Sequence, residues 1–278
     1  MTNWGQFKAS CGIALLALAG VTTQAGAAQC GSSAAGFEQW KRQFAEEARG
    51  KVSASTIEAL LETRYSTTTI AADRGQRSFR LSLDQFLAKR GGPAIVARGR
   101  ALKRSQAALF ASIEQRYGVP PGPLLAIWGM ETGFGRINGN QNAFSAVATL
   151  AYDCRRSAFF TEQLYAALTL IDRGILSPSS RGSMHGEIGQ TQFLPKGILN
   201  YGTGGNLDNA ANALTSTANF LKAHGWRAGA GYQPGQANFA AIQAWNAASV
   251  YQRAIALIGQ QIDGGESASE SAGRSRVR

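Results

Sequence analysis

The chain has 278 residues and a formal net charge of +11, with 44% apolar and only 16% charged residues. It is long enough to bury a substantial core in one or two domains, and its basic surface should attract polyanions. The sequence contains no block of Lys and Arg, no zinc-ligand spacing and no aromatic RNA-binding signature. We therefore do not predict a nucleic-acid partner.

Residues 1–27 are typical of a secretory signal peptide. Lys8 provides a positive start, Cys11 to Gly20 is an apolar run, and Ala25 to Ala27 is a small-residue cleavage site. The run is too short to span a bilayer, so we expect no transmembrane anchor in the mature chain. Removal of Lys8 would lower the net charge to +10. We predict an exported, periplasmic protein whose basic surface meets the anionic cell envelope.

Two cysteines, Cys30 and Cys154, remain after the predicted cleavage. An even number of cysteines in an oxidising compartment favours one disulfide bond. The alternative is a pair of unbonded, buried thiols.

From Ala28 onward the chain is predicted to consist of helices separated by loops. Apolar periodicity, caps and glycine stops place helices in the first part of the chain over residues 37–49, 55–63, 82–90 and 93–117. The second helix is predicted to begin at a capping box formed by Ser55 to Glu58. The third has Ser82 at its start and Gln85 three residues later, which is the same signature.

The most informative helix carries a single acidic residue. Leu124, Ile127, Trp128 and Glu131 fall at helical spacing, which predicts that the Glu131 carboxyl lies on the apolar face. A carboxyl held there loses hydration, and its pKa rises toward the range that a general acid needs near neutral pH. The alternative is that Glu131 closes the helix and pairs with Arg136.

The second half of the chain contains a loop rich in glycine and neutral polar residues. Further helices are predicted over residues 144–152, 157–173, 239–245 and 251–258. Between them, the stretch 182–192 has three closely spaced glycines among Ser and Gln side chains, which donate and accept hydrogen bonds without charge. This inventory suits the hydroxyl and acetamido groups of a sugar better than a phosphate, because the P-loop spacing is absent.

Four motifs occur together in a fixed order: Glu131 to Arg136, Gly189 to Pro195, Ala223 to Trp226 and Ala244 to Asn246. In this order they resemble the lytic murein transglycosylases of the membrane-bound transglycosylase B type. The resemblance runs from about Cys30 to about Asp263 and implies a mainly α, lysozyme-like helical fold around a saccharide-binding cleft.

The resemblance implies one catalytic domain over residues 28–263, with an N-terminal helical part at 28–117 and a catalytic core at 118–263. Residues 264–278 contain almost no apolar side chains and are predicted to be a disordered tail.

The activity implied by the resemblance is cleavage of the β-1,4 bond between N-acetylmuramic acid and N-acetylglucosamine in peptidoglycan. The product is a 1,6-anhydromuramoyl end, formed without water. Glu131 is then the sole catalytic acid and base, and the acetamido group of the substrate replaces a second carboxylate, unlike the scheme of most glycosidases.

The resemblance also implies which residues contact the substrate. They are Ser183, Gln190, Gln192, Phe220, Trp245 and Asn246. Asn246 matches the position that orients the N-acetyl group, whereas Phe220 and Trp245 stand where the family has Tyr. Trp245 is expected either to stack on a pyranose ring or to pack in the core.

Several positions depart from the family or allow two interpretations. Residues 201–208 are too poor in carboxylates for the calcium loop of better-known members, so we predict no metal and no cofactor. Glu187 stands where the family has a small residue. It is expected either to face solvent or an Arg, or to activate a water molecule for hydrolysis. Arg155 and Arg156 either contact an acidic peptide stem or form a solvated helix end.

Two alternative functions remain open from the sequence. The first is a muramidase-type hydrolase, and the second is a non-catalytic peptidoglycan-binding protein on the same fold. Peptidoglycan strands are the expected partner in all three cases, with other cell-wall enzymes as further partners, and we expect a monomer.

Overall fold

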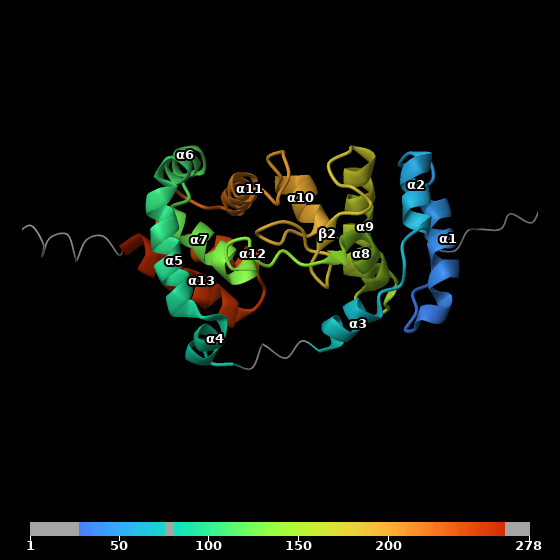
Figure 1. Cartoon of the computed structure of the whole chain (residues 1–278), viewed down its shortest axis with the longest axis horizontal. Helices are drawn as coiled ribbons and strands as arrows, with labels where there is room; N and C mark the ends of the chain where they lie inside the picture. The colour runs from blue at the N-terminus through green and yellow to red at the C-terminus, as the bar shows by residue number, and fades with distance from the viewer. Residues whose placement is uncertain (1–27, 76–80, 265–278) are drawn as a thin grey trace, which may run out of the picture.

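The computed structural model describes residues 28–75 and 81–264, and these form a mainly helical protein (Figure 1). The predicted signal peptide and all of the predicted tail except Gly264 lie outside the described residues. The elements in chain order are the 3-10 helix η1 (Ala34–Gly36), α1 (Phe37–Ala48), α2 (Ala54–Leu61), α3 (Thr67–Arg74), α4 (Leu83–Arg90), α5 (Gly92–Ser105), α6 (Ala107–Tyr117), α7 (Pro121–Thr132), β1 (Gln141–Asn142), α8 (Ala143–Tyr152), α9 (Ser157–Asp172), β2 (Arg181–Gly182), α10 (Pro195–Tyr201), α11 (Ala210–Ala223), α12 (Phe239–Trp245) and α13 (Ser249–Asp263).

The helices pack around two main cores, which lie at opposite ends of the molecule in Figure 1. One core is built mainly by α4–α7 with α11, α12 and α13. The other is built by α1–α3 with α8 and α9. Helices of the predicted N-terminal part are therefore shared between both cores, while the domain boundaries themselves stay predictions.

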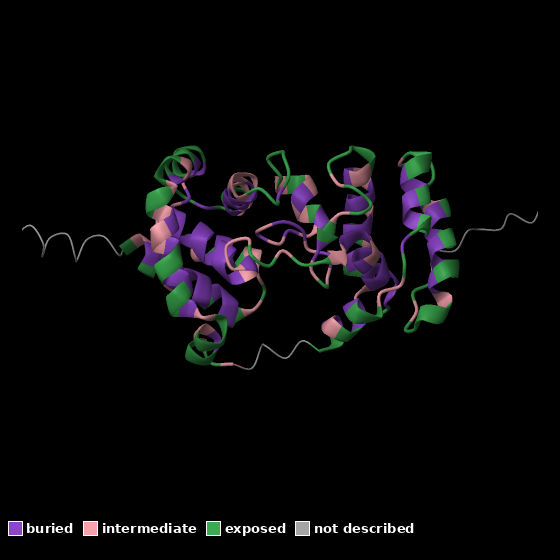
Figure 2. Cartoon of the chain, viewed as in Figure 1, coloured by how far each residue is buried: buried purple, intermediate pink, exposed green. Residues whose placement is uncertain are grey.

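A smaller apolar cluster lies between the two cores. It consists of Ala143, Leu170, Ile188, Phe193, Ile198 and Leu207. Figure 2 shows that the loops and α10 in this central part alternate between buried and accessible segments. The short antiparallel pair β1–β2 joins the loop after α7 to the loop before α10, with Gln141 opposite Gly182. The cluster and the strand pair hold the central loops in place.

The helix caps agree in part with the sequence. The Ser82 side chain accepts a hydrogen bond from the Gln85 backbone N–H, and the Gln85 side chain accepts one from the Ser82 backbone N–H. These two hydrogen bonds form the predicted capping box. The capping box predicted at Ser55 is wrong. Helix α2 begins at Ala54, and Ser53 is its N-cap, accepting a hydrogen bond from the Thr56 backbone at 3.4 Å.

The long helix predicted over 93–117 is wrong because the chain breaks at Gln106, whose φ and ψ are −117° and 30°. The break gives α5 and α6 different partners. Helix α5 packs on α7 and α13, whereas α6 packs on α11. Local periodicity could not show this, because both halves have an apolar face and the break serves tertiary packing.

The predicted disulfide between Cys30 and Cys154 is confirmed, with a Cα–Cα distance of 4.9 Å. Beside it, the Gly31 backbone N–H donates to the Tyr152 carbonyl at 2.9 Å and its carbonyl accepts from Cys154 at 3.1 Å. The disulfide ties the segment before α1 to the turn between α8 and α9.

None of the helices within 28–75 and 81–264 is long and apolar enough to cross a bilayer.

Candidate active site

Helix α7 carries Glu131 to the edge of a cleft. At its start, the Gly122 backbone N–H donates to the Asp263 carboxyl at 2.8 Å. At its end, Gly133 adopts a left-handed backbone with φ 58°, and its N–H donates to the Gly129 carbonyl. The helix therefore ends at Thr132, one residue after Glu131.

The expected one-sided burial of this helix is wrong. Every residue from Pro121 to Met130 is buried, because α5, α11 and α13 all pack on α7. Within this helix, only Glu131 keeps part of its surface accessible. Glu131 is thus the residue through which this otherwise buried helix reaches the cleft.

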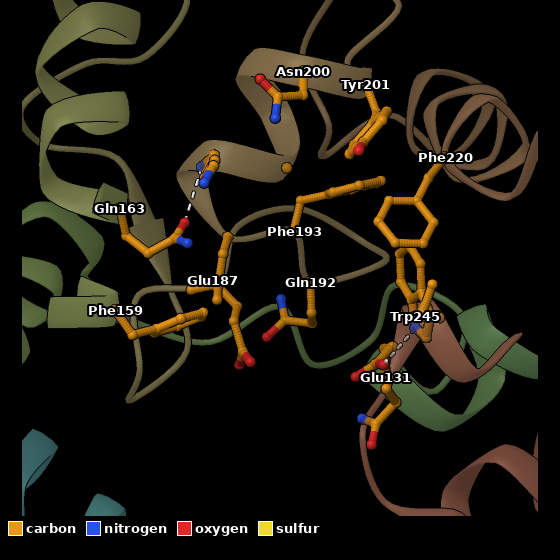
Figure 3. A pocket seen from close by; sticks show the side chains of 15 residues that line it. Glu131, Phe159, Gln163, Glu187, Gln192, Phe193, Asn200, Tyr201, Phe220 and Trp245 are labelled. Carbon is orange, nitrogen blue, oxygen red and sulfur yellow. Dashed lines mark hydrogen bonds between the residues drawn. The ribbon is translucent and has the colours of Figure 1, made fainter. Parts of the chain in front are cut away.

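The cleft next to Glu131 has a cavity volume of about 380 Å³ and is formed by α9, α10, α11, α12 and the loop before α10. Figure 3 shows Glu131 at one end, close to Trp245. The indole N–H of Trp245 donates to Glu131 Oε1 at 3.3 Å. The other lining residues are Phe159, Gln163, Glu187, Gln192, Phe193, Leu194, Lys196, Gly197, Asn200, Tyr201, Phe220, Ala244 and Asn246.

Burial raises the pKa of the Glu131 carboxyl from 4.5 to about 7. The negative charge of Glu187 acts in the same direction, whereas Trp245 and the charge of Arg90 lower the pKa. The buried hydroxyl of Tyr251 also lowers it, although this hydroxyl makes no hydrogen bond of good geometry. Burial outweighs the effects that lower the pKa, so Glu131 keeps its proton up to about pH 7, where a general acid must act.

The alternative that Glu131 pairs with Arg136 is wrong. The Arg136 guanidinium donates instead to the Gly133 carbonyl at 3.0 Å, at the C-terminal end of α7. A cation at that position is stabilised by the helix dipole.

Four of the predicted substrate-binding residues line the same cavity as Glu131: Gln192, Phe220, Trp245 and Asn246. Gln192 has a left-handed backbone with φ 57°, and its amide donates to the Gly189 carbonyl at 2.8 Å. The Asn246 side-chain oxygen accepts from the Ala248 backbone at 2.9 Å. Both amide side chains are therefore held in place by the protein.

The two predicted aromatic residues form one cluster. The Trp245 ring lies edge-on to Phe193 and Phe220, with centroid distances of 5.1 Å in both cases. Phe220 stacks on His224 at 4.0 Å. His224 is the C-cap of α11, as expected for a histidine near a helix C-terminus. Trp245 therefore packs against neighbouring rings and also borders the cleft, and its stacking on a pyranose ring stays a prediction.

Gln190 is placed differently from the other predicted residues and is absent from the cavity lining. Its side-chain oxygen accepts from the Trp128 indole N–H at 2.8 Å, and its amide donates to the Asp208 carbonyl. Its backbone carbonyl also accepts from Thr132 at 2.6 Å. Both ends of the Gln190 side chain are engaged, so it fastens α7 to the neighbouring loops.

Ser183 also lies outside the cavity lining, and its hydroxyl donates to Glu187 Oε2 at 2.8 Å. Glu187 does line the cavity. The predicted partner of Glu187 was solvent or an Arg, whereas the contact observed is with Ser183.

Arg155 and Arg156 both bind the buried carboxylate of Asp73 on α3, each at 2.7 Å. Both side chains keep 44% and 39% of their surface exposed just before α9, so they form a partly solvated helix end that also pairs with Asp73. Contact with an acidic peptide stem stays a prediction. Within residues 28–75 and 81–264, no three or more His, Cys, Asp or Glu side chains gather as a metal site would require.

Sequence reasoning missed several groups around the acid. Tyr251 and Arg90 influence Glu131 from α13 and α4, and Asn200 with Phe159 extends the cleft from α10 and α9. Arg90, Phe159 and Tyr251 fall within helices predicted from the sequence, but the sequence gives none of them a role near Glu131. No spacing signal connects any of them to Glu131, because the contacts depend on how distant helices pack.

Comparison with known proteins agrees with this geometry. Membrane-bound lytic murein transglycosylase B of Escherichia coli strain K12 is 37% identical over 120 residues, which are 40% of this chain and about a third (33%) of that relative's length. The structure of SltB3 from Pseudomonas aeruginosa in complex with NAG-anhNAM-pentapeptide has a TM-score of 0.75 at 28% identity, covering 82% of this chain and 80% of SltB3.

A second solved structure supports the fold alone. The Escherichia coli lytic transglycosylase Slt35 in complex with bulgecin A is 23% identical with a TM-score of 0.70, covering 86% of this chain and 96% of Slt35.

Residues 36–235, well over half of the sequence, match the family described as Transglycosylase SLT domain. The chain therefore belongs to the transglycosylase SLT domain family.

Proposed function

We propose that the protein is a peptidoglycan lytic transglycosylase that cleaves the β-1,4 bond between N-acetylmuramic acid and N-acetylglucosamine. The observation that supports this most directly is the Glu131 carboxyl, whose pKa is raised to about 7, at the end of a cleft that aromatic and amide side chains help to line. Such an acid holds its proton near neutral pH and can give it to a glycosidic oxygen.

In the proposed reaction, Glu131 protonates the glycosidic oxygen of the leaving sugar while the bond from muramoyl C1 to that oxygen breaks. The acetamido oxygen of the same muramoyl unit stabilises the positive charge at C1. The muramoyl 6-hydroxyl oxygen then bonds to C1, and its proton returns to Glu131. No water is consumed, the acid is regenerated, and the product carries a 1,6-anhydro ring.

The neutral side chains around Glu131 suit this chemistry. Gln192 and Asn246 offer amide groups to sugar hydroxyl and acetamido groups, and both amides are held by backbone contacts. Trp245 and Phe220 offer aromatic faces or edges to a pyranose ring. These four neutral side chains add no further positive charge to that of Arg90, which already favours loss of the Glu131 proton.

We also propose that the protein acts in the periplasm after export. The disulfide between Cys30 and Cys154 supports an oxidising compartment. The net charge of +10 that remains after removal of Lys8 would hold the protein near anionic wall polymers. The expectations of a monomer and of other cell-wall enzymes as partners belong to this proposal.

A muramidase-type hydrolase is the second candidate, and one observation favours it. Glu187 lines the same cavity as Glu131, so a second carboxylate is present that could activate a water molecule. The two activities use the same acid but leave different ends on the muramoyl sugar.

Digestion of purified sacculi, followed by mass analysis of the muropeptides, tests the proposal. A transglycosylase gives products lighter by about 18 mass units, one water, than the reducing products of a hydrolase. The Glu131→Gln variant should release neither product while still binding sacculi. Reducing ends from the wild type would refute the transglycosylase assignment, and equal release by the variant would exclude Glu131 from the chemistry.

A further inference from the structure

The cleft contains two carboxylates, and the proposed reaction uses only one of them. Glu131 and Glu187 line the same cavity and lie on either side of Gln192 in Figure 3. Lys196 also lines this cavity, but its ammonium pairs with Glu162. The charge of Glu187 is therefore not neutralised by the one lysine among the lining residues.

Ser183 holds Glu187 in a fixed position. The Ser183 hydroxyl donates its single hydrogen to Glu187 Oε2 at 2.8 Å, and its oxygen accepts from the backbone N–H groups of His185 and Glu187 at 3.1 and 3.2 Å. A hydroxyl has one donor and two acceptor sites, so all three are occupied. Ser183 has no hydrogen-bonding capacity left for a sugar while this arrangement lasts.

The backbone of the same loop is equally constrained. The Ser183 N–H donates to the Glu187 carbonyl at 2.8 Å, and the Gly186 N–H donates to the Ser183 carbonyl at 3.1 Å. A Cβ at Gly182 would collide with the Glu187 carbonyl, so the preceding residue must lack a side chain. The loop from Gly182 to Glu187 is thus a compact turn that presents one carboxylate to the cleft.

No salt bridge offsets the charge of Glu187 within the described parts of the chain. Its one side-chain hydrogen bond there comes from Ser183, which is neutral. A carboxylate held in a partly enclosed cleft acts strongly on a second carboxyl, because the surroundings screen charge less than water does.

We propose that Glu187 is a positioning residue of the reaction: its carboxylate, fixed by Ser183 in the same cavity as Glu131, keeps the catalytic proton on Glu131. The physical reason is that two neighbouring carboxyl groups resist being ionised together. This inference rests on the proposed role of Glu131 as the acid. It assigns Ser183 to holding Glu187, in place of the direct sugar contact predicted from the sequence.

The charged and polar groups that surround Glu131 act in opposite directions. Glu187 favours the protonated form of Glu131, as burial does. Arg90 on α4, Tyr251 on α13 and Trp245 on α12 favour the ionised form. Removing Glu187 takes away one of two influences that retain the proton, so the pKa of Glu131 should fall.

The test is the pH dependence of sacculus cleavage by Glu187→Gln compared with the wild type. Only protonated Glu131 can start the reaction, so activity declines as pH rises through its pKa. In Glu187→Gln this alkaline decline should move to lower pH, and the ratio of activity at pH 8 to that at pH 5.5 should fall about 3- to 10-fold. Glu187→Asp, which keeps the charge, should restore most of the wild-type ratio.

Two further variants separate this role from a structural one. Ser183→Ala should shift the decline in the same direction as Glu187→Gln, because it releases the carboxylate from its fixed position. Glu58→Gln removes an exposed carboxylate on α2 that does not line the cavity and is not among the groups that act on Glu131, so its pH profile should match the wild type.

Three outcomes would overturn the inference. The first two are a pH profile of Glu187→Gln that coincides with that of the wild type and one that moves to higher pH. The third is the loss, in Glu187→Gln, of reducing-end products that the wild type forms, because Glu187 would then be a base that activates water. The Glu131→Gln control decides separately whether the proposed function itself has failed.

A measurement independent of turnover keeps the inference testable in an inactive variant. The Glu131 carboxyl can be titrated by NMR in protein with ¹³C-labelled glutamate carboxyls. The inference predicts a lower pKa for Glu131 in Glu187→Gln than in the wild type. Equal values would overturn it whatever the activity measurements give.

Discussion

Keeping Glu131 protonated should cost the protein stability at neutral pH, and this cost is measurable. In the unfolded chain the carboxyl titrates near its ordinary value of 4.5, whereas in the folded protein its pKa is about 7. Between these values the folded state binds more protons than the unfolded state, so the free energy of unfolding falls as pH rises. The loss is absent below about pH 4.5 and complete above about pH 7.

The magnitude follows from the same two values. A difference between 4.5 and about 7 corresponds to about 3 kcal/mol. Glu131 remains partly accessible to water in the cleft, which lessens the penalty. We therefore expect the free energy of unfolding to fall by about 1.5 to 3 kcal/mol as the pH rises from below about 4.5 to above about 7.

Glu131→Gln removes this penalty, because glutamine is close to protonated glutamate in size and polarity and does not ionise. The variant should be more stable than the wild type by about 1.5 to 3 kcal/mol at pH 8 and nearly equal to it at pH 4. Urea unfolding followed by circular dichroism at both pH values measures the difference. An equal difference at pH 4 and pH 8, or a less stable variant at pH 8, would refute the claim that burial holds the proton on Glu131.

Trp245→Phe removes the indole N–H that favours ionised Glu131, so the alkaline decline in activity should move to higher pH. A shift of the pH–rate profile to lower pH would contradict this assignment. Replacing Cys30 and Cys154 by Ser opens a loop with a sequence separation of 124. The loop-closure entropy of such a loop corresponds to about 5 kcal/mol of stabilisation by the disulfide. Urea unfolding should show a loss of about 2 to 5 kcal/mol, and an unchanged midpoint would contradict it. Gln192→Gly relieves a left-handed backbone with φ 57° while deleting a cleft amide, so stability should change by less than about 1 kcal/mol and cleavage should fall about tenfold or more. A variant that is destabilised but equally active per folded molecule would show that Gln192 is structural.

The sequence predicted the centre of the site well, because its chemistry is concentrated in short motifs. Glu131, Gln192, Trp245 and Asn246 come from separate segments and line one cavity. The position of Glu131 near a helix end followed from the Gly133 stop, which requires a left-handed backbone.

Predictions failed where long-range packing decides the local structure. Gln106 breaks a periodic helix because its two halves pack against different partners. Helix α7 reads as one-sided in sequence, yet it is covered by α5 and α13. Periodicity describes one helix at a time and does not indicate how many neighbours it will have.

The partners of the polar side chains could not be predicted for a related reason. Ser183 and Gln190 have the chemistry of sugar ligands, but Glu187 and Trp128 occupy their hydrogen bonds. A motif gives the type of a side chain, and only the fold shows which partner it meets first.

The pKa of Glu131 in the wild-type protein is the measurement that tests the account most directly. Titration of ¹³C-labelled glutamate carboxyls, with the Glu131→Gln variant to assign the signal, gives this value in the folded protein. The account predicts a pKa of about 7. A value near 4.5 would show that the carboxyl is ionised at neutral pH, and Glu131 could not then be the acid that starts the reaction.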